Sequence, residues 1–392
     1  MSAVVELLQE LIRIPSVNPQ GEPGTSCTGE EKIAQFVGNY LSHLGMEVEM
    51  QFVEKRRPNV IGKLKSKTSR YHILLGPHLD TVSVVGMTID PFAGVVKDRK
   101  VWGRGASDTK GPMAAMLMAL RRLVAEKLTL ENTDIWFVGL MGEESGNDGI
   151  AYLLNSDFFG EKGIKPNFGI AGEPTDLKIV HRHKGALWFR IRARGKSCHA
   201  ARPDLGENAI LKIRRAIDFV AHELPEAYAH LKDDVLGQPT FSVTTIHGGS
   251  KVNIIPDFCE VEVDHRSLPQ EAHEEVLGCV RKALPECEVE MVSDRPGLDT
   301  PADHPYIQKL IGVLRRRTSN SEHLREQRLE HRTFLTGAPW FADCSLMSKE
   351  GIPSIAFGPG SIDQAHTKDE FIEIVELEKG VDIFYNFLGG LE

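Results

Sequence analysis

The sequence predicts an α/β fold with a mostly parallel central sheet, into which a smaller α+β domain of the ferredoxin-like kind is inserted. Three observations support this prediction. The chain has 392 residues, which is too long for one compact core and favours two domains. Short apolar segments alternate with helical segments in the first half and again near the end. Between Leu187 and Val292 the order changes to strand, helix, strand, strand, helix and strand.

The elements of the first domain follow from hydrophobic periodicity and from turn residues. The first twelve residues read as an amphipathic helix, and Thr28 to Glu31 match a capping box that opens a second helix, which ends at Gly45. A third helix is expected over 110–123, and others near 306–316 and at the C-terminus. The polar stretch His323–Arg332 indicates a surface loop or a helix turn. Short apolar runs predict strands over 46–52, 59–64, 72–76, 134–140, 167–171 and 354–358.

The inserted segment has its own order of elements. Strands are expected over 187–194, 241–246, 258–266 and 286–292, and helices over 207–224 and 271–284. We therefore expect residues 1–185 and 300–392 to form one domain, and residues 186–299 to form the inserted domain.

Composition excludes several classes of protein. The formal net charge is -9, with no basic stripe, which argues against a nucleic-acid-binding surface. There is no apolar stretch of the roughly 18 residues that a membrane span requires, and the N-terminus lacks the pattern of a signal peptide. The six cysteines are scattered without a CxxC pair, which is typical of reduced thiols. We expect a cytoplasmic protein that acts neither on nucleic acid nor on a membrane.

Side chains that can carry chemistry occur at five places, most of them directly after an apolar strand, where an open α/β sheet places its ligands. In Gly76–Val82, His78 and Asp80 are two residues apart and point to the same side of an extended chain, so that one can bind a metal ion while the other steadies the imidazole. Met141–Ser145 contains two adjacent carboxylates, Glu143 and Glu144, which repel each other unless a positive charge lies beside them.

The other three places are the glycine-rich turn Gly103–Gly111 with Asp108, Gly172–Thr175 with Glu173, and Gln364–Thr367 with His366. Each pattern is weak alone, because a helix cap would explain Asp108 and a solvated acidic loop would explain adjacent glutamates. Together they supply enough oxygen and nitrogen ligands for two divalent ions. Two such ions can share one carboxylate and one water, and can activate that water near neutral pH.

In this order the five motifs resemble those of the metallo-aminoacylase and carboxypeptidase superfamily of zinc peptidases, in particular its acetylornithine deacetylase and succinyl-diaminopimelate desuccinylase family. The resemblance covers essentially the whole chain. It implies a zinc-peptidase-like catalytic domain, an inserted dimerisation or lid domain, and two zinc ions, for which cobalt can substitute. It also implies a cis peptide between Asp108 and Thr109. The implied ligands are His78, Asp108 and Glu173 for one ion, and Asp108, Glu144 and His366 for the other.

The resemblance also assigns roles around the two ions. It implies that Glu143 is the general base and that Asp80 orients His78. In the inserted domain, His199 within Gly195–Ala200 resembles the histidine that reaches a neighbouring subunit's active site and stabilises the oxyanion. Asn253 resembles a substrate-contacting asparagine. Arg266 resembles the arginine that grips a substrate carboxylate, a task that suits its planar, two-pronged donor group.

We therefore expect a hydrolase that cleaves the amide bond of a small N-acyl amino acid and that forms a homodimer through the inserted domain. The motifs around the metal ligands resemble acetylornithine deacetylases most, which predicts N-acetyl-L-ornithine as substrate and L-ornithine and acetate as products, a reaction of arginine biosynthesis. Succinyl-diaminopimelate desuccinylase activity is the alternative, followed by dipeptidase or carboxypeptidase activity. A catalytically inactive binding relative is the hypothesis from a different class.

Overall fold

The computed structural model describes residues 2–21, 25–319 and 334–391. Unit 1 comprises Met1–His181, Thr300–Thr336 and Ala342–Glu392, and unit 2 comprises Arg182–Asp299 and Gly337–Phe341. The sequence prediction places the segment Gly337–Phe341 in the first domain, whereas in the structure it belongs to unit 2. The polar stretch His323–Arg332 lies outside the described residues. Among the described residues, each unit has its own hydrophobic core.

Unit 1 is built on a mixed sheet with the strand order β1-β2-β6-β3-β7-β17-β8. The four central strands β6, β3, β7 and β17 pair in parallel, which confirms the largely parallel sheet. The flanking strands β1, β2 and β8 are antiparallel, an arrangement that apolar runs alone do not predict. The strands are β1 Glu47–Glu54, β2 Arg57–Leu64, β3 Tyr71–Gly76, β6 Thr133–Gly139, β7 Phe168–Ala171, β8 Ile179–His183 and β17 Ser354–Ala356.

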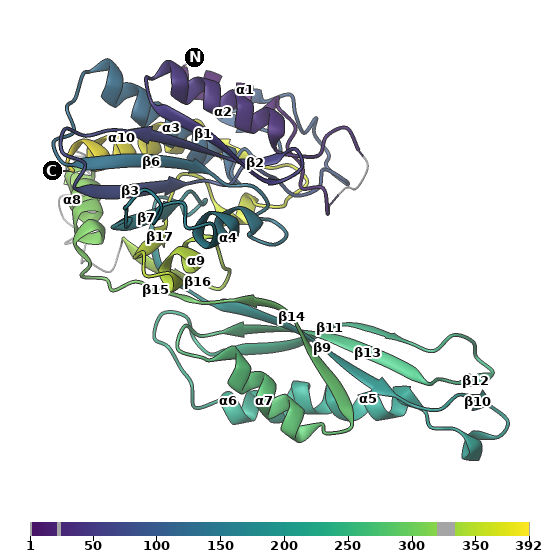
Figure 1. Cartoon of the computed structure of the whole chain (residues 1–392). Coiled ribbons are helices and arrows are strands. Elements are labelled where there is room, and N and C mark those ends of the chain that lie inside the picture. The colour runs from purple at the N-terminus through teal and green to yellow at the C-terminus, as the bar shows by residue number, and fades with distance from the viewer. Residues whose placement is uncertain (1, 22–24, 320–333, 392) are drawn as a thin grey trace. The chain divides into compact units, whose positions relative to one another are not determined.

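Helices cover both faces of this sheet (Figure 1), which is why its central strand β6 is buried along its whole length. In β6, Ile135 and Phe137 belong to the core under α1, α2, α3 and α10, whereas Trp136 and Val138 belong to the core under α4 and α9. These six helices bury their apolar sides against the sheet. The helices are α1 Ala3–Ile12, α2 Glu31–His43, α3 Lys110–Ala125, α4 Asp148–Asn155, α8 Pro305–Ser319, α9 Cys344–Lys349 and α10 Ile374–Gly389.

The start of α2 differs from the prediction. Thr28 does not cap the helix, because its hydroxyl donates to the carbonyl of Thr25, and the residue that precedes the first turn is Glu30. The Glu30 carboxylate is in turn held by the Arg57 guanidinium in a buried, two-pronged ion pair at 2.7 and 2.8 Å. The capping-box prediction is therefore wrong, since a tertiary ion pair rather than a local cap fixes this helix end.

Unit 2 has the β-α-β-β-α-β order that the sequence predicts. Its four strands form an antiparallel sheet in the order β11-β13-β9-β14, the ferredoxin-like arrangement. Helices α5 and α7 cover one face over a core that includes Phe189 and Ile213. The predicted helix 207–224 is instead α5 followed by one turn of π-helix, Phe219–Glu223, and a short α6. The main elements are β9 Gly185–Arg194, α5 Ala209–Asp218, α6 Leu224–Tyr228, β11 Thr240–Gly248, β13 Phe258–Ser267, α7 His273–Ala283 and β14 Cys287–Arg295.

Short elements complete the two units. They are β4 Val95–Lys97, β5 Lys100–Trp102 and β18 Phe371–Glu373, which form a three-stranded sheet, β10 Cys198–His199 and β12 Ile254–Ile255, which pair with each other, and β15 Leu298–Asp299 and β16 Leu335–Ala338. Among the described residues, no helix has the length and apolar character needed to traverse a lipid bilayer.

Candidate active site

Three parallel strands of unit 1 end at the same edge of the sheet. Leu75 of β3 pairs with Phe137 of β6 on one side and with Ile170 of β7 on the other. The segments that follow these strands carry His78, Glu143 and Glu144, and Glu173. Because the carboxyl ends of parallel strands lie together, the fold gathers these side chains at one edge.

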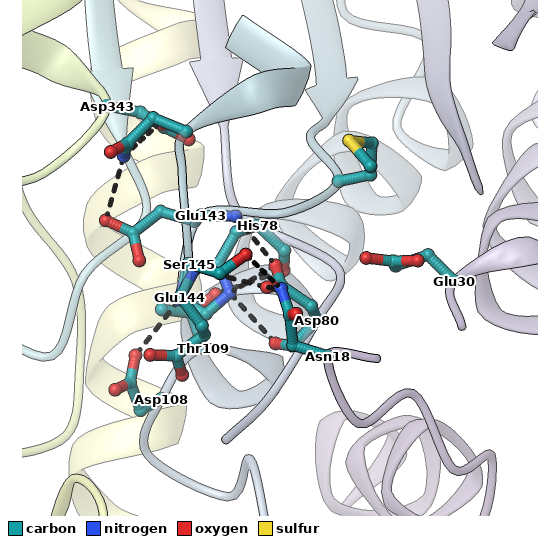
Figure 2. A network of polar contacts seen from close by, with 12 residues as sticks. Asn18, Glu30, His78, Asp80, Asp108, Thr109, Glu143, Glu144, Ser145 and Asp343 are labelled. Carbon is teal, nitrogen blue, oxygen red and sulfur yellow. Dashed lines mark hydrogen bonds and ion pairs between the residues drawn. The ribbon is translucent and has the colours of Figure 1, made fainter. Parts of the chain in front are cut away.

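Three of the predicted ligands form a compact cluster at this edge. One ligand atom from each of His78, Asp108 and Glu144 lies within 4.8 Å of the others. His78 Nε2 lies 3.1 Å from Asp108 Oδ1. The peptide between Asp108 and Thr109 is cis, as the resemblance implies. Figure 2 shows Asp108, Glu144 and His78 close to one another.

His366 completes the cluster from a distant part of the chain. Its Nε2 lies 3.1 Å from Glu144 Oε2 and 3.3 Å from Asp108 Oδ2. Whereas His78 is buried, the His366 side chain is 56% exposed, so the cluster is open on the His366 side. Glu173 is buried nearby, close enough that its charge contributes to raising the pKa of His78.

Burial and like charge set the protonation of these carboxyl groups. Burial, and then the charge of Asp108, raises the pKa of Glu144 to about 7. Burial also raises the pKa of Glu173 to about 8, with a further contribution from Asp108 and other neighbouring carboxylates. Burial would raise the pKa of Asp108 as well, but hydrogen bonds with His366 and His78 hold it below its usual range. A nearby cation would relieve this repulsion.

The surroundings of one oxygen atom of the cluster indicate whether a metal ion fits there. Glu144 Oε1 is buried and has no hydrogen-bond partner among the residues that the structure describes. Such a group is costly unless something binds it. The imidazoles of His78 and His366 and the carboxylates of Asp108, Glu144 and Glu173 are the kinds of donor that zinc and similar divalent ions prefer. The residues present therefore fit a divalent metal site.

Asp80 has more contacts than the sequence suggests. Its carboxylate Oδ1 lies 3.5 Å from His78 Nδ1, which is also 2.9 Å from the backbone carbonyl of Asp80. The same carboxylate accepts hydrogen bonds from the backbone N–H groups of Glu143 and Glu144, both at 3.1 Å. The side-chain amide of Asn18 donates to it at 2.8 Å. Asp80 therefore holds the imidazole and the Glu143–Glu144 turn in one arrangement (Figure 2).

Glu143 lies beside the cluster and next to two further polar residues, Asn147 and Asp343. Its Oε1 accepts a hydrogen bond from the Asn147 amide at 3.3 Å, and the same amide donates to Asp343 Oδ1 at 2.8 Å. Burial raises the pKa of Glu143 well above its ordinary value, and Glu173 and Asp343 contribute in the same direction. Asn18, Asn147 and Asp343 were not singled out by sequence reasoning, because each is a single polar residue whose neighbours are brought close only by the fold.

The three predicted residues of the inserted domain lie in unit 2. The short strands β10 and β12 pair His199 with Ile254, and the backbone N–H of Ala200 donates to the carbonyl of Asn253 at 3.0 Å. His199 and Asn253 are therefore neighbours, and both are exposed. Arg266 lies at the end of β13, where Asp264 binds its guanidinium at 2.9 and 3.0 Å and the ring of Phe341 lies 5.5 Å from it.

Comparison with known proteins places these observations in a family. Residues 74–389 match Peptidase family M20/M25/M40. An acetylornithine deacetylase from Photorhabdus laumondii subsp. laumondii is 30% identical over 387 residues, which cover 94% of this chain and 92% of the relative. An M20 family metallo-carboxypeptidase from Sulfolobus solfataricus has the same fold, with a TM-score of 0.79, 18% identity and 99% of both chains covered. The YXEP protein of Bacillus subtilis, described as a dinuclear metal binding peptidase from the M20 family, matches with a TM-score of 0.67 and 16% identity over 98% of this chain and 96% of its own.

Proposed function

The chain belongs to Peptidase family M20/M25/M40 and is a metal-dependent hydrolase that acts on amide bonds, and on this premise we propose that it removes the acetyl group of N-acetyl-L-ornithine. The gathering of His78, Asp108 and Glu144 beside the buried Glu143 carries the proposal of hydrolysis. The choice of substrate is supported by the 30% identity to acetylornithine deacetylases over nearly the full chain.

We propose a site for two zinc ions. His78, Asp108 and Glu173 would hold one ion, and Asp108, Glu144 and His366 the other. The distances from His366 to Glu144 and Asp108, together with the unsatisfied Glu144 Oε1, support this assignment. Ions bound there would polarise the substrate carbonyl and lower the pKa of a bound water.

We propose that Glu143 carries out the proton transfers. A carboxylate at this position would take a proton from the attacking water as the water oxygen bonds to the amide carbon. It would then give that proton to the nitrogen as the carbon–nitrogen bond breaks, so that one residue acts first as base and then as acid. The Asn147 amide, which holds Glu143 Oε1, and the Asp80 carboxylate, which holds the Glu143 backbone, support a fixed position for this group.

Other residues would bind and orient. Asp80 would keep the His78 imidazole in place through Nδ1. Arg266 would bind the substrate carboxylate, exchanging one carboxylate partner, Asp264, for another. His199 would stabilise the oxyanion of the tetrahedral intermediate, and Asn253 would contact the substrate. The exposure of His199, in β10, and of Asn253, which directly precedes β12, is compatible with these roles.

The oligomeric state and location are part of the proposal. We propose a homodimer formed through unit 2, in which His199 serves the neighbouring subunit's site. We also propose a cytoplasmic location, which is supported by six scattered cysteines that form no disulfide.

A small panel of substrates tests the proposed function. Purified protein, loaded with zinc or cobalt, should hydrolyse N-acetyl-L-ornithine with a higher kcat/KM than N-succinyl-diaminopimelate or any of several dipeptides. A preference for the succinyl substrate would support the desuccinylase alternative, and a preference for dipeptides would support a peptidase. Hydrolysis of none of them by metal-loaded protein would favour an inactive binding relative.

A further inference from the structure

The segment that carries Asp108 has little regular structure of its own. Residues 103–109 connect β5 to α3, and two of their glycines, Gly103 and Gly105, have positive φ angles of 151° and 82°. A buried loop of this kind must find hydrogen-bond acceptors for its backbone N–H groups outside regular elements. The question is which group supplies them.

A single buried carboxylate does so. Glu370 Oε1 accepts from the backbone N–H groups of Ser107 at 2.8 Å and Asp108 at 3.0 Å. Glu370 Oε2 accepts from the N–H of Gly105 at 3.0 Å and from the Arg104 guanidinium at 2.8 Å. The side chain is fully buried, so water does not compete for these four donors. The loop is therefore folded around one carboxylate, more than 260 residues away in sequence.

The backbone next to Glu370 is attached to the same loop. The N–H of Gly103 donates to the carbonyl of Glu370 at 3.0 Å, and the Ser107 hydroxyl donates to the carbonyl of Phe371 at 3.1 Å. Glu370 also follows His366 by only four residues. The two segments that supply Asp108 and His366 therefore meet at Glu370, and the two side chains lie 3.3 Å apart.

We propose that Glu370 is a positioning residue that fixes Asp108 relative to His366 and thereby sets the affinity for the metal ion that they share. This inference rests on the proposed metal site. Neither the spacing of the motifs nor the ligand set requires a carboxylate at this position, since Glu370 itself does not face the ligand atoms but binds the backbone behind them.

The substitution Glu370→Gln tests this with little change of shape. An amide offers one acceptor oxygen, and its NH₂ group would face two of the four donors, so the loop would lose part of its support. The metal affinity should fall by about tenfold or more, as is usual when a residue that orients a ligand is changed. If this variant does not fold, Glu370→Asp, which keeps the charge but shortens the side chain, carries the same test.

Asp134 provides a matched control. It is also a fully buried carboxylate: its Oδ1 accepts from the N–H and hydroxyl of Ser66 and from the hydroxyl of Ser69 at 2.8 to 2.9 Å, and its Oδ2 forms an ion pair with Lys63 at 2.9 Å. It lies at the start of β6, whereas Glu143 and Glu144 follow the other end of that strand. Asp134→Asn should therefore lower the stability of unit 1 without changing the metal site.

The experiment is a titration of metal-free protein with Co²⁺, followed by calorimetry and by the absorption spectrum of the bound ion. The inference predicts weaker binding and an altered spectrum for Glu370→Gln, and wild-type binding for Asp134→Asn. Wild-type affinity in the Glu370 variant, or equal weakening in both variants, would overturn it. Absence of binding to the wild-type protein would instead overturn the proposed function on which the inference rests.

Discussion

Two adjacent glutamates of the site are in different surroundings. Glu144 is in contact with His366 and has one buried oxygen without a partner among the described residues, whereas Glu143 accepts a hydrogen bond from the Asn147 amide. Neighbouring residues with opposite surroundings suit different tasks, metal binding for one and proton transfer for the other. The difference leads to a prediction that separates the two.

Glu143→Gln should lower kcat by about a hundredfold to ten-thousandfold, the usual contribution of a general acid–base group, because an amide cannot take a proton from water. Metal content should stay at the wild-type level. Glu144→Gln should instead lose metal, since one of the proposed ligands is changed. Activity measured beside elemental analysis distinguishes the two variants, and near-wild-type turnover by Glu143→Gln would remove the base assignment.

The protonation of the cluster predicts how metal binding depends on pH. In the folded protein without metal, burial raises the pKa of Glu144 to about 7 and of Glu173 to about 8, and hydrogen bonds to Asp108 and Glu144 raise that of His366 to about 10. Each group holds its proton more tightly than in the unfolded chain, so this contribution to stability is present at low pH and is lost as pH rises through these values. A cation replaces those protons.

The gain in Tm on adding Zn²⁺ should therefore be larger at about pH 8.5 than at about pH 6, because fewer protons then have to be displaced. Thermal unfolding with and without metal at the two pH values measures this gain. A Tm shift that is equal at both values, or larger at the acidic one, would show that these groups do not bind the ion.

The sequence predicts the residues of the metal cluster but not the polar residues around it. His78, Asp108, Glu144 and His366 lie together, as the motifs suggest. Parallel strands bring the segments that carry His78 and Glu144 to one edge of the sheet, whereas Asp108 follows β5 of the small three-stranded sheet. Asn147 and Asp343 contact each other across nearly 200 residues, and no local pattern marks either of them. The catalytic and ligand roles themselves stay predictions until the variants are measured.

At the scale of elements, apolar runs predicted where strands lie but not how the outer ones pair. The central strands are buried on both faces and read as continuous apolar segments, whereas β1 alternates between exposed and half-buried residues. Its antiparallel pairing with β2 depends on a register that the composition of a single strand does not contain. The start of α2 was predicted wrongly for a similar reason. The Glu30 side chain at this helix end is held by Arg57, which lies 27 residues away in sequence.

Helix α4 fixes the turn that carries the two glutamates. The N–H of Gly149 donates to the carbonyl of Met141 at 3.0 Å, and Asn59 bridges the carbonyl of Gly149 and the N–H of Met141. A Cβ added at Gly149 would lie 2.4 Å from the Met141 carbonyl oxygen and 2.5 Å from the Asn59 side chain. Only glycine permits this approach of helix to strand exit.

Gly149→Ala should lower the free energy of unfolding by about 1–3 kcal/mol, the usual effect of overpacking, and should also lower kcat because the displaced backbone precedes Glu143. Gly278→Ala in α7 is the matched control, since no atom lies within 4 Å of its added Cβ. There we expect a gain of about 0.5–1 kcal/mol from the better helix propensity of alanine. Urea unfolding of both variants checks this, and a neutral Gly149→Ala would contradict the tight contact.

At the scale of the whole molecule, the chain combines two units with separate cores, and the metal cluster belongs entirely to unit 1. His199 and Arg266 belong to unit 2, and the proposal gives His199 a role in the neighbouring subunit's site. If His199 has that role, mixed dimers of two different inactive variants should regain activity, which neither variant shows alone.

Mixing the inactive variants Glu143→Ala and His199→Ala, with exchange of subunits, should restore about a quarter of wild-type activity, because half of the dimers are mixed and each of these has one complete site. Turnover before and after exchange measures the recovery. Each variant alone, treated identically, is the control. No recovery after verified exchange would place His199 at its own subunit's site or outside catalysis.

The most direct test of the central claim is to remove the metal and return it. Protein treated with a chelator should lose hydrolysis of N-acetyl-L-ornithine, and activity should return as Zn²⁺ or Co²⁺ is titrated to two ions per chain, the number that the proposed ligand set binds. The variant His366→Ala should fail to reach this stoichiometry. Full activity in metal-free protein, or recovery that does not depend on the added ion, would contradict the account of a metal-dependent amide hydrolase.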